Sequence, residues 1–177
     1  MKLDEYQAEA AKTAIYPRGL AYTALGISGE LGELVVAVLA KSTSATAEIS
    51  DVLWYVAMLA KDCGLTLSMV AGRKTFPLKI KESERCWGLD DILEELTIHV
   101  GMACKNVKKT IRDDDGKLSK KRQKAIKLAL RRVLYLLADL TNNAEWCAPL
   151  EECAKMNIEK LTSRQERGVL HGDGDTR

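Results

Sequence analysis

Two acidic motifs on consecutive predicted helices constrain the fold of this chain most strongly. The motifs are Glu30-Leu-Gly-Glu33 and Glu48-Ile-Ser-Asp51, and each spaces two carboxylates by three residues, on one face of a helix. Each motif begins four residues before an apolar position of the helix, so the acids border the apolar stripes. Carboxylates crowded beside a core are strongly unfavourable unless a cation neutralises them. The pattern predicts two helices packed around a divalent metal ion.

Apolar residues recur at helical spacing along most of the chain, and the composition agrees with a helical protein. Phe occurs once and Pro three times, while Ala, Leu, Lys and Glu dominate. The sequence therefore predicts an all-α fold. Ser42, Thr43 and Ser44 are N-cap candidates, and Gly64 is a helix-ending signal. The expected helices span residues 3–15, 21–41, 45–63, 89–111, 119–144 and 150–165, with a turn or short helix at 66–71.

Bulk properties narrow the class of protein. With 177 residues, 46% of them hydrophobic, the chain is long enough for a real core, and its net charge of +2 implies no general attraction to nucleic acid or membrane. The N-terminus lacks the features of a signal peptide, and no uninterrupted apolar run approaches the ~20 residues of a membrane span. We expect a cytoplasmic protein. Its cysteines lack C-x-x-C spacing and are expected to be reduced thiols: Cys63, Cys86, Cys104, Cys147 and Cys153.

The two helical sets resemble each other, which suggests an internal duplication. Residues 34–41 align with 98–105, and residues 54–59 align with 134–139. The alternative is two unrelated hairpins that share generic amphipathicity. We expect a single all-α domain over residues 1–177, made of a metal-binding half (1–71), a linker (72–88), a degenerate second half (89–165) and a tail (166–177). In this register Glu30 aligns with Glu94, but Glu33, Glu48 and Asp51 align with Thr97, Leu128 and Arg131, so the second half has lost the acidic set.

The acidic residues have the chemistry of a magnesium site. In an antiparallel hairpin with a rise of ~1.5 Å per residue, Glu33 and Asp51 lie roughly level, flanked by Glu30 and Glu48. Oxygen ligands without nearby His or Cys favour Mg²⁺, with Mn²⁺ as a second option. We expect all four as metal ligands, with Glu33 or Glu48 also helping a water molecule to attack phosphorus. The alternative is an exposed acidic helix, which the lack of Lys and Arg between Arg18 and Lys41 makes less favourable.

A second signal lies near the C-terminus. Asn157, Lys160 and Arg164 form one stripe on a helix, and an amide with two cations suits a polyphosphate. The tail from Arg167 contains three glycines and is either an arm that folds over a ligand or a frayed terminus. The basic run at 120–124 has no interleaved aromatics, so a solvated face is expected there rather than a nucleic-acid site.

Together these residues resemble the MazG-like, all-α nucleoside triphosphate pyrophosphohydrolases. The likeness rests on Tyr6-Gln7, Thr13, the segment 25–33, the segment 48–55, the segments 157–161 and 164–168, and the Gly-Asp-Gly-Asp-Thr-Arg ending. The resemblance implies a four-helix-type bundle, a dimeric or tetrameric assembly, and Mg²⁺-dependent release of pyrophosphate and a nucleoside monophosphate. It implies metal ligation by the acidic set and substrate contacts from Asn157, Lys160 and Arg164.

The chain departs from compact members of that family by an extra segment, about residues 72–147. With this segment the chain is similar to the dimeric dUTPases. We expect a fused pseudo-dimer in which a degenerate half that has lost the acidic set supports the half that holds the metal. Whether Asn157 and Lys160 reach the acidic set within one chain or from a partner stays open at this point.

Three functions compete. The first is a nucleotide pyrophosphohydrolase, the second a non-catalytic nucleotide binder, and the third a helical adaptor with accidental acidic pairs. Trp54 and Tyr55 either stack a nucleobase or, more commonly for aromatics at helical spacing, belong to the core.

Overall fold

The computed structural model describes residues 1–17, 19–78 and 88–169, and the regular elements within them are helices. An isolated bridge between Lys2 and Thr75 is the one β-type pairing within these ranges. The all-α fold expected from the sequence is confirmed. The helices of the described ranges are α1 (Leu3–Lys12), α2 (Leu20–Leu39), α3 (Ala45–Asp62), α4 (Leu67–Ala71), α5 (Leu89–Asp113), α6 (Lys120–Asn143) and α7 (Leu150–Glu166).

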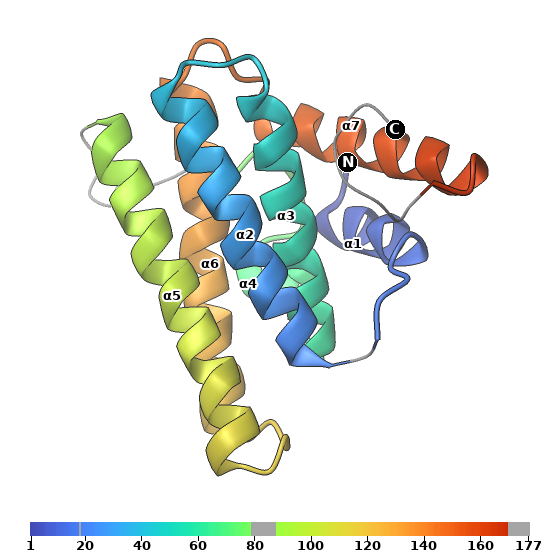
Figure 1. Ribbon diagram of the computed structural model, residues 1–177, viewed down its shortest axis with the longest axis vertical. Coiled ribbons are helices and arrows are strands. Elements are labelled where there is room, and N and C mark those ends of the chain that lie inside the picture. Colours follow the sequence, from blue (N-terminus) through green and yellow to red (C-terminus); the bar gives the residue numbers. More distant parts are fainter. Residues whose placement is uncertain (18, 79–87, 170–177) are drawn as a thin grey trace.

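Helix α3 lies at the centre of the molecule (Figure 1). It packs against α1, α2, α4, α6 and α7, and 13 of its 18 residues are buried. A helix that is apolar on nearly every side is stable only when other elements surround it. The acidic residues of α3 are therefore held in the best-packed helix of the protein.

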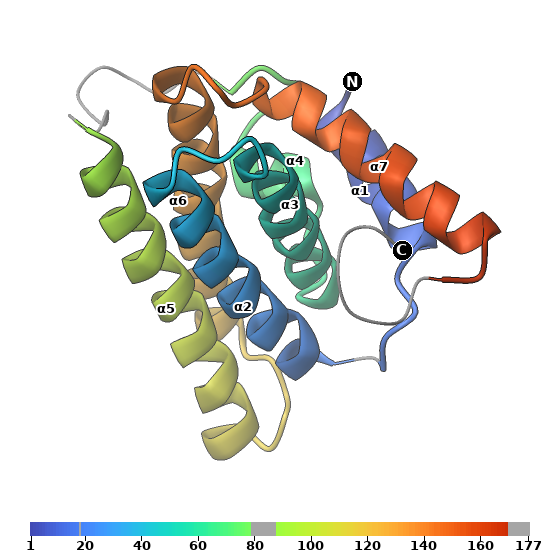
Figure 2. The same cartoon turned by 45° about the horizontal axis from the view of Figure 1, so that its top comes forward.

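Two antiparallel hairpins form the larger layer. Helices α2 and α3 make one, and α5 and α6 make the other, with α2 against α5 and α3 against α6. Helices α1 and α7 lie side by side on the remaining flank of α3 (Figure 2). Helices α1 and α7 thus run side by side, with the N-terminus at Glu151 near the start of α7 and Lys12 near Gln165 at its end. One hydrophobic cluster runs through both hairpins, so the two expected halves share a core.

Most helix ends match the sequence prediction within two residues, and the exceptions have local causes. Helix α1 stops at Lys12 rather than near residue 15, because the Thr13 hydroxyl donates to the Ala10 carbonyl oxygen and holds the last turn closed. Gly64 adopts a left-handed φ of 70° directly after the end of α3, as its position indicated. Ser44 occupies the N-cap of α3, but its side chain makes no capping hydrogen bond.

Some sequence expectations fall on other parts of the chain. Nine residues of the expected linker, 79–87, and the tail from residue 170 lie outside the described residues, as does Cys86. Cys63, Cys104, Cys147 and Cys153 are free thiols, and burial raises the pKa of Cys63 and of Cys153 to about 12. Helix α2 is long and apolar enough by composition to be a candidate membrane span, although Glu30 and Glu33 interrupt its apolar run. A core helix passes the same test, so this is weak evidence.

Tyr55 of α3 packs directly onto the backbone of α2. A Cβ added at Gly26 would lie 2.0 Å from Cε1 of that ring, so only glycine lets the two helices approach this closely. The ring also contacts Tyr22 and Trp54, which extends the helix–helix contact toward α1.

We expect Gly26→Ala to destabilise the protein by roughly 1–3 kcal/mol, because the methyl group forces the Tyr55 ring out of its site. The control is Gly101→Ala on α5, where a Cβ meets no atom within 4 Å and should stabilise by up to about 1 kcal/mol. Urea unfolding of both variants measures the difference. Equal stability of Gly26→Ala and the wild type would contradict the close approach.

Candidate metal centre

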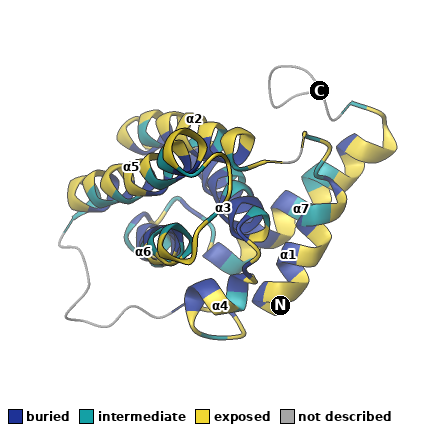
Figure 3. Ribbon diagram, turned by 90° about the horizontal axis from the view of Figure 1, so that it is seen from below, coloured by how far each residue is buried: buried dark blue, intermediate teal, exposed yellow. Residues whose placement is uncertain are grey.

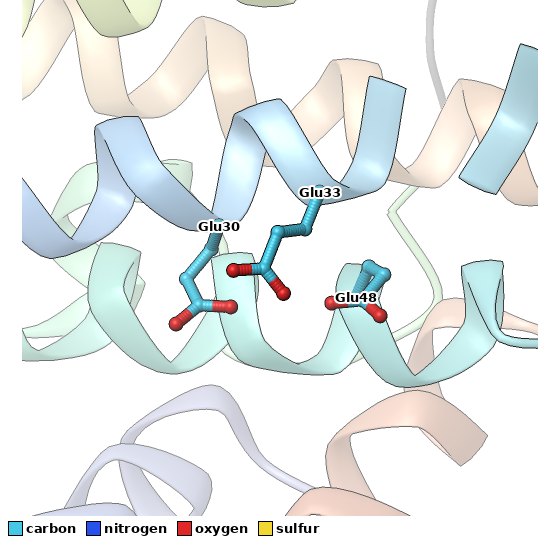
Figure 4. A group of neighbouring side chains, drawn as sticks. All are labelled: Glu30, Glu33 and Glu48. Atoms are coloured by element: carbon cyan, nitrogen blue, oxygen red, sulfur yellow. The ribbon is translucent and has the colours of Figure 1, made fainter. Parts of the chain in front are cut away.

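The contact between α2 and α3 gathers three carboxylates. Glu30 and Glu33 extend from α2 and Glu48 extends from α3, and their side chains converge in the space between the helices (Figure 4). One oxygen from each lies within 4.8 Å of the others. The sequence geometry had placed Glu33 level with Asp51, whereas in the structure it is Glu48 that completes this group with Glu33.

The three carboxylates differ in exposure. Glu48 is 8% exposed and belongs to the buried side of the cluster. Glu30 is half-buried, and Glu33 is exposed. The cluster therefore has a floor inside the protein and an opening to solvent on the side of Glu33.

The pKa of Glu30 reflects both its burial and the carboxylates around it. Burial raises its pKa to about 7, and the carboxylates of Asp51, Glu33 and Glu48 act in the same direction, while Lys160 opposes them. The raised pKa of Glu30 therefore reflects burial first and the neighbouring carboxylates second.

Asp51 lies outside the group of three but acts electrostatically on Glu30, and it also contacts α7. Its Oδ2 accepts a hydrogen bond from Lys160 Nζ at 2.6 Å, and its Oδ1 accepts one from Asn157 Nδ2 at 3.1 Å. Two of the three residues expected at the C-terminal stripe thus reach the acidic set within one chain. No partner chain is needed to bring them there.

Residues outside the acidic motifs hold this arrangement in place. The Tyr6 hydroxyl donates to Asn157 Oδ1 at 3.3 Å, which directs the amide nitrogen of Asn157 toward Asp51. The Ser50 hydroxyl donates to the Cys153 carbonyl oxygen at 3.0 Å and joins α3 to α7 one residue before Asp51. Neither role follows from local spacing, because each partner lies more than a hundred residues away.

The three residues of the C-terminal stripe differ in their exposure to solvent. Asn157 is fully buried and Arg164 is 6% exposed, whereas the side chain of Lys160 is 22% exposed. Lys160 is therefore the member of the stripe that a solvent-borne ligand reaches most easily. Asn157 has no solvent-exposed surface and donates a hydrogen bond to Asp51.

The two aromatic residues of α3, Trp54 and Tyr55, also differ in their surroundings. Trp54 is 8% exposed, and its indole nitrogen donates to the Ala10 carbonyl oxygen and to Thr13 Oγ1, so it belongs to the core. Tyr55 is half-buried between Gly26 and the Tyr22 ring. Burial raises the pKa of the Tyr55 hydroxyl, and the Glu30 carboxylate acts in the same direction.

The donor set fits a hard divalent cation. It consists of carboxylate oxygens, held close together with one side open to solvent, as Mg²⁺ or Mn²⁺ requires when it keeps water ligands. Glu30, Glu33 and Glu48 are positioned to ligate directly. Asp51 joins them only if its hydrogen bonds to α7 are exchanged or shared.

Comparison with known proteins identifies one relationship. The chain is 33% identical over 91 residues to the Gene 37 protein of Mycobacterium phage L5, an alignment that covers 51% of this chain and 77% of that protein. This chain belongs to the family of the Gene 37 protein. No protein-family model matches it, including any for the MazG-like enzymes, and no solved structure matches it.

The name of the Gene 37 protein states no activity. Membership in its family therefore leaves the activity to be argued from the acidic cluster, and the likeness to the MazG-like enzymes rests on the motifs alone.

Proton release from Glu30 should make the metal-free protein less stable as the pH rises. The folded state keeps a proton up to a pKa of about 7, whereas the unfolded chain loses it near 4.5, so the stabilisation is present at low pH and is lost between these values. After allowance for partial exposure we expect a loss on the order of 1–2 kcal/mol.

Urea unfolding in EDTA at a series of pH values measures this effect. Glu30→Gln should remove this part of the pH dependence, and Glu94→Gln on the exposed face of α5 should leave it in place. A pH profile that is the same for Glu30→Gln and the wild type would contradict the assignment.

Proposed function

We propose that this protein is a magnesium-dependent nucleotide pyrophosphohydrolase. In this proposal it cleaves a nucleoside triphosphate between the α and β phosphates and releases a nucleoside monophosphate and pyrophosphate. The single observation that carries the proposal is the convergence of Glu30, Glu33 and Glu48 within 4.8 Å, with the Lys160 ammonium paired to Asp51 beside them. The resemblance of these motifs to the MazG-like enzymes supports the choice of reaction.

The acidic cluster would hold Mg²⁺ through Glu30, Glu33 and Glu48, with Mn²⁺ as a substitute. Bound there, the ion would supply positive charge to the phosphate oxygens and acidify a water molecule. A nucleoside triphosphate has the complementary charge, so substrate and carboxylates can share one site only when such a cation lies between them.

The protein side chains have separate roles in this proposal. Glu33 or Glu48 orients the attacking water and takes its proton, since both carboxylates belong to the cluster that would hold the ion. The Lys160 ammonium stabilises negative charge on the phosphates. Asn157 orients Asp51, the carboxylate that pairs with Lys160. Arg164 lies on the same stripe of α7 and is buried, so it adds positive electrostatic potential without contacting the substrate.

A non-catalytic nucleotide binder is the second candidate. The same carboxylates and Lys160 would bind magnesium and a polyphosphate, but no water would be placed for attack. The helical adaptor is disfavoured, because accidental acidic residues on exposed helices splay into solvent, whereas Glu48 is 8% exposed and meets carboxylates of a second helix.

Glu48→Gln should lower pyrophosphate release by roughly a hundredfold or more, because it removes a charged ligand and a candidate base at the buried floor of the cluster. The measurement is pyrophosphate and monophosphate production from a panel of ribo- and deoxyribonucleoside triphosphates with Mg²⁺. The matched control is Glu94→Gln, the same change on an exposed face of α5.

The outcomes separate the candidates. Turnover lost in Glu48→Gln but kept in Glu94→Gln supports the hydrolase. Wild-type protein that is stabilised against heat by Mg²⁺ and nucleotide, without any product, supports the binder. No stabilisation by Mg²⁺ would remove the metal site itself.

A further inference from the structure

The outward face of α2 is apolar along its whole length. Leu25 is 75% exposed, Val36 69%, Leu39 65% and Tyr22 46%. Scattered exposed apolar side chains are ordinary, but a continuous row of them on one helix marks a contact surface. Figure 3 shows the outer side of α2 as exposed. We call the following set the outer stripe: Tyr22, Leu25, Gly29, Gly32, Val36 and Leu39.

The outer stripe bears no charge. Helix α2 contains two charged residues, Glu30 and Glu33, and both side chains turn toward α3 (Figure 4). Successive members of the stripe are three or four residues apart, which keeps them on one line of the helix.

The stripe is symmetric about its own centre, the peptide between Glu30 and Leu31. Its members form pairs that lie equally far from that point, large apolar with large apolar and glycine with glycine. A two-fold axis brings the same surface of two subunits together, so that residue i of one meets residue j of the other and the reverse. Antiparallel packing of two α2 helices about this point would join Tyr22 to Leu39, Leu25 to Val36, and Gly29 to Gly32.

Among the described residues, nothing packs against the two central glycines of the outer stripe. Gly26 admits the Tyr55 ring, but a Cβ at Gly29 or Gly32 would meet nothing within 4 Å. Each costs helix stability of roughly 1 kcal/mol relative to alanine. At the crossing point of two helices, glycine instead permits close contact of the backbones.

Helix α5 would then lie beside its own copy, and its charges suit that arrangement. The Cys104 thiol donates to the Ala24 carbonyl oxygen at 3.1 Å, which sets α5 and α2 at one level there. The two helices run antiparallel (Figure 1), so the centre of the outer stripe is level with residues 97 and 98 of α5.

Asp90 and Lys105 lie equally far from that level, and both are exposed. Across the same axis, Asp90 of one copy is therefore level with Lys105 of the other. Opposite charges at the rim of an apolar contact favour the matching register over others.

We propose that two copies of this chain associate through the outer stripe, with their α2 helices antiparallel across a two-fold axis level with Glu30 and Leu31. The two-fold symmetry of the outer stripe is what contact with a second copy requires, whereas contact with a lipid surface requires no such symmetry. The opposite face of α2 buries Ile27 and Leu34 completely in the bundle, so α2 cannot enter a bilayer as a span without opening the core. This proposal is independent of the proposed enzymatic function.

Charge substitutions in the full chain test both the surface and the register. Leu25→Lys and Val36→Glu, each alone, should raise the dimer dissociation constant by on the order of a hundredfold, because each buries an unpaired charge at the contact. The double variant Leu25→Lys/Val36→Glu should recover dimerisation, since each lysine then faces a glutamate across the axis. Leu128→Lys on α6, where the wild-type side chain is 56% exposed, is the control and should remain dimeric.

Sedimentation equilibrium measures the constants, and circular dichroism confirms that each variant is helical. Three results would overturn the proposal: a monomeric wild type at every concentration, single variants that dimerise like the wild type, or a folded double variant that stays monomeric. A monomeric wild type that floats with phosphatidylcholine–phosphatidylglycerol vesicles would assign the outer stripe to a membrane surface instead.

Discussion

The structure depends on the packing of α2 against α3, which forces like charges together. Ile27 and Leu34 of α2 and Ile49 and Val52 of α3 are fully buried on the apolar sides of these helices. Burying each such side chain is worth about 1.5–3 kcal/mol, so several of them outweigh the repulsion among neighbouring carboxylates. The helices therefore stay together, and Glu30 responds with a raised pKa instead.

Helix α7 supplies the partners of the fourth carboxylate, Asp51. A carboxylate that is mostly shielded from solvent is destabilising when it has no partner. Lys160 and Asn157 provide partners for Asp51, and Tyr6 of α1 fixes the amide that makes one of these bonds. The acidic cluster is consequently divided into three convergent carboxylates and one that is tied to the flank formed by α1 and α7.

Sequence periodicity predicted the helices well because most of them bury one continuous stripe. It also indicated that the acidic motifs of α2 and α3 would meet, since antiparallel neighbours joined by a short turn have few other arrangements. Sequence periodicity could not predict that Lys160 lies beside Asp51, because the spacing of residues within one helix does not indicate which distant helix that helix contacts. The motif resemblance suggested that those residues act together but left open whether one chain suffices.

The outer stripe was missed for a different reason. Helix α2 has apolar residues on two sides, and a search for one inward stripe accepts Leu31 and Leu34 and overlooks Leu25 and Val36. The fate of the individual acidic residues was equally unpredictable. It depends on small differences in depth between Glu33, Glu48 and Asp51 that only the assembled bundle determines.

The ion pair between Asp51 and Lys160 joins residues that are 109 positions apart. During synthesis on the ribosome, the hairpin of α2 and α3 is made long before α7 exists. The nascent hairpin thus carries its acidic groups before the Lys160 ammonium that pairs with Asp51 has been made. Helix α7, the last described helix, therefore supplies the positive charge that pairs with Asp51 of this hairpin.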